Sequence, residues 1–163
     1  MANISDAYGT ATFAAPTSDD VTWLYSLFDS AKRWAYSTFF EELCIPYSNG
    51  EGYEAYCSFS GEGRWAYDSN IQDMFEGICY WLNERKRTED LDRLKALSFR
   101  VTFDFDDYEP GCDVLYHMVG EISHNEGSDT ADFTVLEDQN YDVTPENLVN
   151  LGYYETIEDA MQD

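Results

Sequence analysis

Histidine and cysteine are the side chains best suited to catalysis or metal binding, and their spacing in this chain supports neither. His117 and His124 lie seven positions apart on or just after one predicted strand, so a straight strand would point them to opposite faces. The cysteines form no C-x-x-C pair, and no zinc-site spacing occurs. They are Cys44, Cys57, Cys79 and Cys112. Cys57 and Cys79 lie beside apolar residues, as small core residues do. We therefore expect no catalytic residue, no metal and no cofactor.

Carboxylates are far more abundant than histidine or cysteine. The segment that starts at Asp104 resembles a twelve-residue calcium loop, which requires Gly at its sixth position and Glu at its twelfth. These positions hold Glu109 and Leu115, so the match fails. Signatures of the nucleophile elbow, the P-loop and dinucleotide binding are absent from the sequence. A small enzyme would need carboxylates or His117 to converge in a pocket, and we keep this as an alternative.

The acidic residues are unevenly distributed along the chain. Residues 101–163 contain 17 Asp or Glu and no Lys or Arg, whereas residues 1–100 contain 16 acidic and 9 basic side chains. The formal net charge of −24 is therefore concentrated in the C-terminal part. Such a polyanion repels nucleic acid and anionic membranes, so we expect neither as a direct partner. A basic protein is the partner that this charge favours.

The composition predicts a folded chain in spite of its charge. Of its 163 residues, 44% are hydrophobic and 17% are aromatic, whereas disordered acidic segments contain few aromatic residues. The N-terminus has neither the basic region nor the apolar core of a signal peptide, and no run approaches the ~20 apolar residues of a membrane span. We expect a cytoplasmic protein with reduced thiols.

The first part of the chain shows helical periodicity. Residues 1–17 are small and polar and predict an extended lead-in. Apolar side chains at three-and-four spacing predict a long helix over residues 19–43, ended by Pro46. Aromatic side chains widen its apolar surface and form a secondary candidate interface for a partner or a second copy. They are Trp23, Trp34 and Phe40.

Apolar and polar residues alternate further along the chain. Residues 53–60 predict a half-buried strand, followed by a turn at Gly61-Glu62-Gly63 and a short partner strand over residues 64–67. Helices are expected from Asp68 or Ser69 to about Arg87, and from Thr88 to about Leu97.

The acidic part predicts an antiparallel meander with strands over residues 98–106, 113–122 and 130–136. A helix begins at Thr144-Pro145, and Thr156 caps a last helical turn. The order of elements predicts an α+β fold, an antiparallel sheet or meander with helices packed on one face. We expect one domain over residues 18–163, with a subdivision near residue 97 and an acidic C-terminal half, 98–163.

The acidic strands suggest a use for the charge. Alternate residues of a strand lie about 6.8 Å apart, comparable with the spacing of phosphates along one DNA strand at roughly 6 to 7 Å. Carboxylates at this spacing would fit the DNA-binding groove of a basic protein. The candidate contact residues are Asp104, Asp106, Asp107, Glu109, Asp113, Glu121, Asp129, Asp132, Glu137 and Asp138.

The length, charge, aromatic content and folded acidic half together resemble the DNA-mimic inhibitors of phages and mobile elements. These include antirestriction proteins of the ArdA type and acidic anti-CRISPR proteins. The resemblance lies in bulk properties, and no sequence motif carries it. It implies a DNA-binding defence enzyme as the target, blocked sterically, and allows an inhibitor homodimer.

We therefore expect a non-enzymatic protein in the host cytoplasm that binds and inhibits a nucleic-acid-binding defence protein, a CRISPR effector or a restriction enzyme, by mimicking DNA charge. An acidic immunity or antitoxin-like protein that caps a basic nuclease would use the same electrostatics. A protein from a salt-loving organism would also have an acidic surface with few lysines, and this chain has three.

Overall fold

The computed structural model describes residues 4–31, 38–64 and 66–162, and it confirms an α+β fold with an antiparallel sheet. The strands are β1 (Ile4–Ala15), β2 (Thr38–Phe40), β3 (Tyr47–Ser48), β4 (Tyr53–Arg64), β5 (Phe99–Glu109), β6 (Val114–His124) and β7 (Asp132–Asn140). The helices are α1 (Ser18–Ser30), α2 (Asp68–Gln72), α3 (Met74–Glu84), α4 (Thr88–Ala96), α5 (Pro145–Asn150) and α6 (Ile157–Ala160).

The first strand of the chain lies at the centre of the sheet. The strand order is β2-β4-β1-β5-β6-β7, with β3 also paired to β4, and every neighbouring pair is antiparallel. The prediction of an extended lead-in over residues 1–17 is therefore wrong. The inward side chains of β1 include Ala7, Ala11 and Ala15, and alanine gives little strand signal. Because β1 pairs with both β4 and β5, one sheet joins the segments before and after residue 97.

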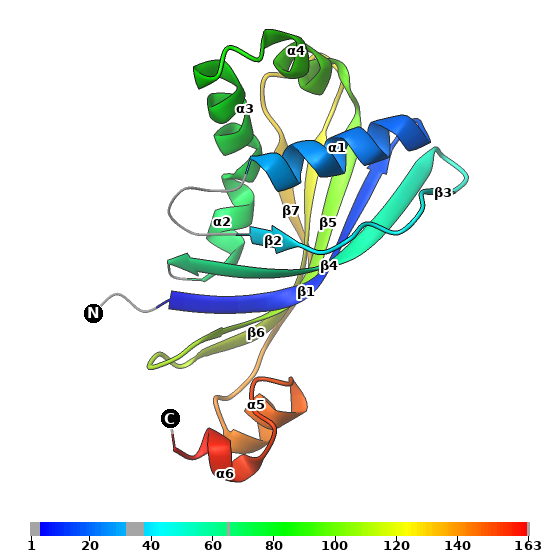
Figure 1. Cartoon of the computed structure of the whole chain (residues 1–163). Coiled ribbons are helices and arrows are strands. Elements are labelled where there is room, and N and C mark those ends of the chain that lie inside the picture. The colour runs from blue at the N-terminus through cyan, green and yellow to red at the C-terminus, as the bar shows by residue number, and fades with distance from the viewer. Residues whose placement is uncertain (1–3, 32–37, 65, 163) are drawn as a thin grey trace.

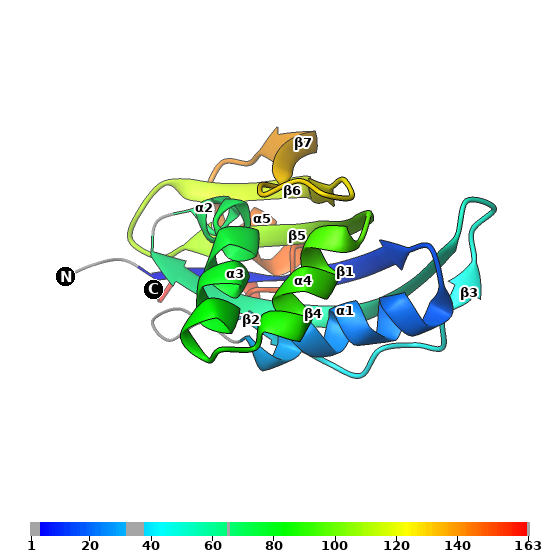
Figure 2. The same ribbon diagram turned by 90° about the horizontal axis from the view of Figure 1, so that it is seen from above.

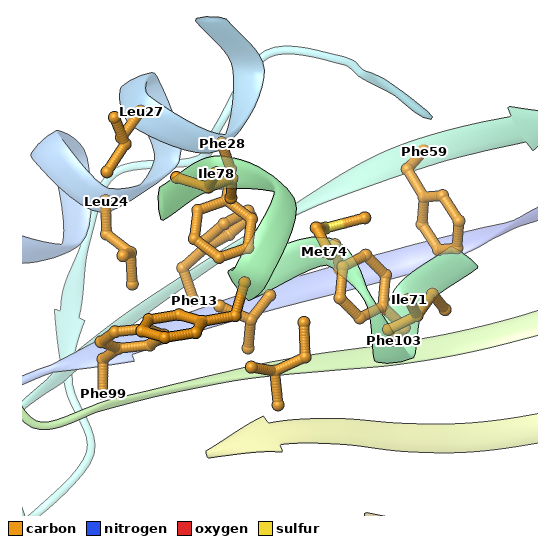
Figure 3. Close-up of a cluster of buried hydrophobic side chains, with 14 of the residues drawn as sticks. Phe13, Leu24, Leu27, Phe28, Phe59, Ile71, Met74, Ile78, Phe99 and Phe103 are labelled. Atoms are coloured by element: carbon orange, nitrogen blue, oxygen red, sulfur yellow. The ribbon is translucent and has the colours of Figure 1, made fainter. Parts of the chain in front are cut away.

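One face of the sheet packs against the helices α1 to α4 (Figures 1 and 2). Leu24 and Phe28 of α1 and Ile78 of α3 lie over Phe13 and Phe103 of the sheet (Figure 3). The rings of Phe13 and Phe28 meet edge to face, with centroids 5.6 Å apart. Burial of each side chain of this size contributes about 1.5–3 kcal/mol, so this layer holds the sheet in place.

Helix α1 begins where the sequence predicts and ends earlier. Its N-cap Thr17 accepts a hydrogen bond from the Asp20 N–H at 3.1 Å. The predicted helix over residues 19–43 is wrong in its last part, because residues 38–40 form β2. A β-branched residue and two phenylalanines there pair with β4, as such residues favour. Residues 32–37 of the predicted helix lie outside the described residues.

Strand β4 continues through Gly61, Glu62 and Gly63, where a turn was predicted, and ends at Arg64. The partner strand predicted over residues 64–67 does not form in the described residues, and residue 65 lies outside them. Both glycines leave room for side chains of the segment that follows. A Cβ on Gly61 would lie 2.2 Å from the Tyr67 ring, and one on Gly63 would lie 2.0 Å from Asn70 Nδ2. Since Tyr67 and Asn70 are buried, the glycines mark a close approach within a strand.

The C-terminal meander is confirmed, although its strands are longer than predicted. Phe99, Val101, Phe103 and Phe105 all face the core. Because β5 extends to Glu109, the turn to β6 covers residues 110–113 and not 107–111. The helix predicted from Asp68 or Ser69 is divided into α2 and α3. The N-caps predicted for α5 and α6 both accept hydrogen bonds from backbone N–H groups.

Candidate functional site

The face of the sheet opposite α1 to α4, which we call the open face, carries acidic side chains from several strands. Residues paired across an antiparallel sheet point to the same face, and successive residues point to opposite faces. On β5, Asp104 and Asp106 therefore alternate with the buried Phe103 and Phe105. Glu121 of β6 faces the same way, and Thr102 Oγ1 donates a hydrogen bond to its Oε2 at 3.3 Å.

Helices α5 and α6 lie on the same side of the sheet as the open face but cover only one end of it (Figure 1). The Tyr153 ring packs edge to face on Tyr8 and Tyr108, with centroids 5.1 and 5.2 Å apart. Its hydroxyl donates to the Asp6 carbonyl at 3.1 Å. The prediction of helices on one face therefore holds for α1 to α4, while these two short helices form a separate small core with Leu115.

The open face is strongly negative. Its carboxylates come from five strands: Asp6, Glu54, Glu62, Asp104, Asp106, Glu121, Asp132 and Glu137. Among the side chains that the structure describes on this face, the only Lys or Arg is Arg100. Its Nη2 lies 3.1 Å from Glu51 Oε2, so a carboxylate already pairs with its charge.

His117 lies between two of these carboxylates. Its Nδ1 is 2.9 Å from Asp106 Oδ1, and its Nε2 is 3.2 Å from Asp104 Oδ1. An ionised carboxylate only accepts hydrogen bonds, so both contacts are satisfied together when both ring nitrogens carry protons. His124 points into the core, as the odd spacing predicts, and its two nitrogens lie 2.7 and 2.8 Å from the carbonyl oxygens of Leu97 and Ser128.

The structure brings together five of the ten predicted contact residues on the open face. They are Asp104, Asp106, Glu121, Asp132 and Glu137. Asp113 is exposed in the turn between β5 and β6, and Asp138 is exposed on the other side of β7. Asp129 lies beside the helix layer, where Lys95 Nζ approaches its Oδ1 to 3.2 Å. Asp107 and Glu109 are buried, so these two cannot contact a partner and the prediction for them is wrong.

Asp107 belongs to a buried hydrogen-bond network at one end of the sheet. Ser5 Oγ donates to its Oδ1, and the Tyr67 N–H donates to its Oδ2 at 2.8 Å. The Tyr116 hydroxyl also hydrogen-bonds to this carboxyl group. Burial raises the pKa of Asp107, and the hydrogen bonds from Ser5, Tyr67 and Tyr116 counteract part of that rise. The Asp107 carboxyl group is therefore held by buried hydrogen bonds and has a structural role.

The described basic side chains other than Arg100 lie in the helix layer. Arg93 Nη2 is 3.0 Å from Asp20 Oδ1, and its guanidinium lies 4.2 Å from the centre of the Trp23 ring. Arg85 and Arg87 lie over Trp81 at 4.9 and 5.0 Å. Most described basic side chains therefore lie away from the open face, next to acidic side chains of the helix layer such as Asp20 and Asp90. Figure 2 shows this layer of helices on one side of the sheet.

The secondary interface does not form as predicted in the described residues. Trp23 is half-buried beneath Arg93, and Phe40 packs in the core with Phe13 and Phe103, at ring-centroid distances of 5.6 and 6.3 Å. Trp34 lies outside the described residues. Exposed aromatic side chains line instead the β2–β4 part of the open face, and sequence reasoning missed them. They are Phe39, Tyr47 and Tyr56.

Two grooves lie elsewhere on the surface. One of about 340 Å³ lies at the end of the sheet beside Arg100 and His124, and one of about 320 Å³ lies between α5 and the β5–β6 turn. Neither is lined by His117. No group of three or more His, Cys, Asp or Glu in the described part of the chain could hold a metal ion. Within the described residues, His117 and its two carboxylates meet on the open face and not in either groove.

Comparison of the chain with protein-family models, curated proteins and solved structures found no match. Among the described residues, no helix has both the length and the apolar character that crossing a membrane requires.

Proposed function

We propose that the protein binds a basic, nucleic-acid-binding host defence protein in the cytoplasm and inhibits it by offering carboxylates in place of DNA phosphates. The target class is a CRISPR effector or a restriction enzyme. The observation that carries the proposal is the gathering of carboxylates from several strands on the open face, where Arg100 is the only Lys or Arg among the described side chains, whereas the helix layer carries both acidic and basic side chains.

A rigid sheet suits this role. Strands hold side chains about 6.8 Å apart along the strand and about 4.8 Å apart across it. Asp104, Glu121 and Glu137 come from three adjacent strands, so their carboxylates form a patch and not a single row. Duplex DNA carries one charge per about 1.7 Å of axis, and a protein that binds it has cations at matching density. Binding by such a patch would weaken steeply as salt rises.

Apolar contacts would support the electrostatic ones. Phe39, Tyr47 and Tyr56 border the acidic patch on the β4 side of the open face. Tyrosine is enriched at protein interfaces, and an arginine side chain stacks well on its ring. An arginine-rich DNA-binding surface would therefore find both carboxylates and aromatic rings on this face.

The test is a competition experiment. The immobilised protein is incubated with host lysate at low salt, bound proteins are identified by mass spectrometry, and the purified partner is then titrated with duplex DNA. We expect the DNA to displace the protein from the partner, and the protein to inhibit the partner's cleavage of DNA. A partner that binds the protein and DNA simultaneously would contradict mimicry.

Two variants with the same change in net charge test whether binding depends on the open face or on net charge alone. The first combines Asp104→Asn, Glu121→Gln, Asp132→Asn and Glu137→Gln on the open face. The second combines Glu42→Gln, Glu76→Gln, Asp92→Asn and Glu126→Gln at exposed positions elsewhere. Each removes four negative charges from a chain of net charge −24. We expect at least a tenfold loss of affinity for the first only, with a shallower salt dependence. Equal losses of affinity in the two variants would show that binding depends on net charge and not on the open face.

A further inference from the structure

Strand β7 forms a long unpaired edge of the sheet. It is the last strand in the order, and its nine residues, Asp132–Asn140, pair with β6 on one side only. Phe133 is half-buried, and the other side chains of the strand are exposed. Figure 2 shows β7 at the margin of the sheet, outside the helix layer. Within the part of the chain that the structure describes, no further strand lies against it.

The opposite edge of the sheet consists of two short strands and the segment between them. Strands β2 and β3 lie against β4, and the segment between them is also bonded to it. The Glu41 N–H donates to the Ser58 carbonyl at 2.9 Å, and the Cys44 N–H donates to the Tyr56 carbonyl at 3.0 Å. Of the two edges, β7 is therefore the one that presents a long, continuous strand, the arrangement that best accepts an added strand.

The side chains of β7 define what kind of strand would fit. Asp132, Thr134 and Glu137 point to the open face, and Asp138 points to the other side. Val135 and Leu136 are about half exposed, at 47% and 52%, beside an irregularity in the β6–β7 register. The edge thus combines backbone groups, three carboxylates and two apolar side chains, with no Lys or Arg in residues 101–163.

We propose that β7 binds an extended basic segment of the partner protein as an additional strand of the sheet. Lys or Arg at alternate positions of that segment would face Asp132 and Glu137, and apolar residues between them would contact Val135. This inference rests on the proposed function, because it requires a basic partner. It adds backbone hydrogen bonding to a recognition that otherwise depends on side-chain charge.

A second copy of the chain is a poorer occupant of the same edge. Each copy carries a net charge of −24, and a β7–β7 pair would bring two strands with three carboxylates each into contact. Acidic residues on an edge strand oppose such self-pairing. They favour a strand of opposite charge, which a lysine- or arginine-containing segment supplies.

The experiment uses a synthetic eight-residue peptide of alternating lysine and valine, and a control peptide with the same side chains and every backbone nitrogen methylated. Both carry the same charge, and only the first can donate backbone hydrogen bonds. Binding to the isotopically labelled full chain is followed by amide chemical shifts and hydrogen exchange. We expect the largest shifts and slowed exchange in β7, and at least tenfold weaker binding of the methylated peptide.

Other outcomes separate this inference from the proposed function. Equal binding of both peptides, with shifts spread over Asp104 and Glu121, would overturn the added strand and leave electrostatic binding by the open face intact. Absence of binding by the unmethylated peptide at millimolar concentration would also overturn it. A dimer of the free protein with β7 amides protected in its interface would overturn it in favour of a second copy.

Discussion

His117 Nδ1 lies 2.9 Å from Asp106 Oδ1 on the open face. The imidazole also contacts Asp104, so it shields two of the carboxylates that the proposed function assigns to a partner. A basic partner must compete with this internal contact before it can use either side chain. His117 thus occupies carboxylate oxygens that a cation of the partner would otherwise contact.

We expect His117→Gln to strengthen binding of a basic probe. A partly exposed contact between polar side chains of this kind contributes about 0.2–1 kcal/mol, so the gain in affinity is up to about fivefold per contact. Calorimetric titration with oligolysine at low salt measures it. Gln139→Glu, which adds a carboxylate next to His117 in the paired strand, should act in the same direction. Unchanged affinity in both variants would show that the imidazole does not compete with a cation.

The buried Asp107 should make stability depend on pH. Burial raises its pKa above the ordinary value of 3.8, so the folded chain holds this proton more tightly than the unfolded chain. Its contribution to stability is therefore complete below about pH 3.8, and it is lost as the pH rises through the folded-state pKa. Asp107→Asn removes this group from the titration.

Chemical unfolding at a series of pH values measures how the free energy of unfolding depends on Asp107. We expect the free energy of unfolding of Asp107→Asn to fall less between pH 4 and 7 than that of the unchanged chain. Asp113→Asn, at an exposed position in the next turn, is the control and should keep the original pH dependence. Identical slopes for all three chains would contradict the assignment, whatever the absolute stabilities.

Cys57 should be unreactive in the folded protein. It is 3% exposed in the core, and burial raises its pKa to about 12, so almost no thiolate forms at pH 8. We expect a thiol reagent to modify Cys57 at least a hundredfold more slowly than Cys44, which is partly exposed. Peptide mapping after timed alkylation distinguishes the two. Comparable rates would show that the β4 region opens readily.

The small core under α5 and α6 should open independently of the main core. Tyr108 packs there against Tyr153, apart from the cluster that joins the sheet to α1 through α4. We expect Tyr108→Ala to lower protection from hydrogen exchange over residues 145–160 by about 2–4 kcal/mol and to leave the amides of β5 and β1 protected. Tyr56→Ala, exposed on the open face, serves as the control. Loss of protection throughout the sheet would contradict two independent clusters.

Much of the fold follows from local pattern. The alternation of Phe99, Val101, Phe103 and Phe105 with polar residues predicts β5 and the direction of Asp104 and Asp106. Strand β1 cannot be predicted from local alternation, because its buried residues are mostly alanine. Only pairing with β4 and β5 makes it a strand. Small side chains suit a central strand covered closely by a helix, and sequence alone does not show that cover.

The errors among the predicted contact residues also arise because pairing between strands cannot be read from local pattern. Strand β5 continues beyond the predicted turn, since Tyr108 pairs with Asp6 and Glu109 pairs with Val114. Continued alternation then turns Asp107 and Glu109 inward. The contact of His117 with two carboxylates also required the register of β5 on β6, which spacing along one strand does not reveal.

The central position of β1 has a consequence for how the chain reaches its native state. During synthesis, Ile4 is made 60 residues before its neighbour Arg64, and Asp6 is made 102 residues before Tyr108. The middle of the sheet therefore cannot close until β5 has left the ribosome. Long-range pairing of this kind slows folding and leaves the first strand exposed meanwhile. Small and polar side chains such as Ser5, Gly9 and Thr10 lower the tendency of the unpaired β1 segment to aggregate.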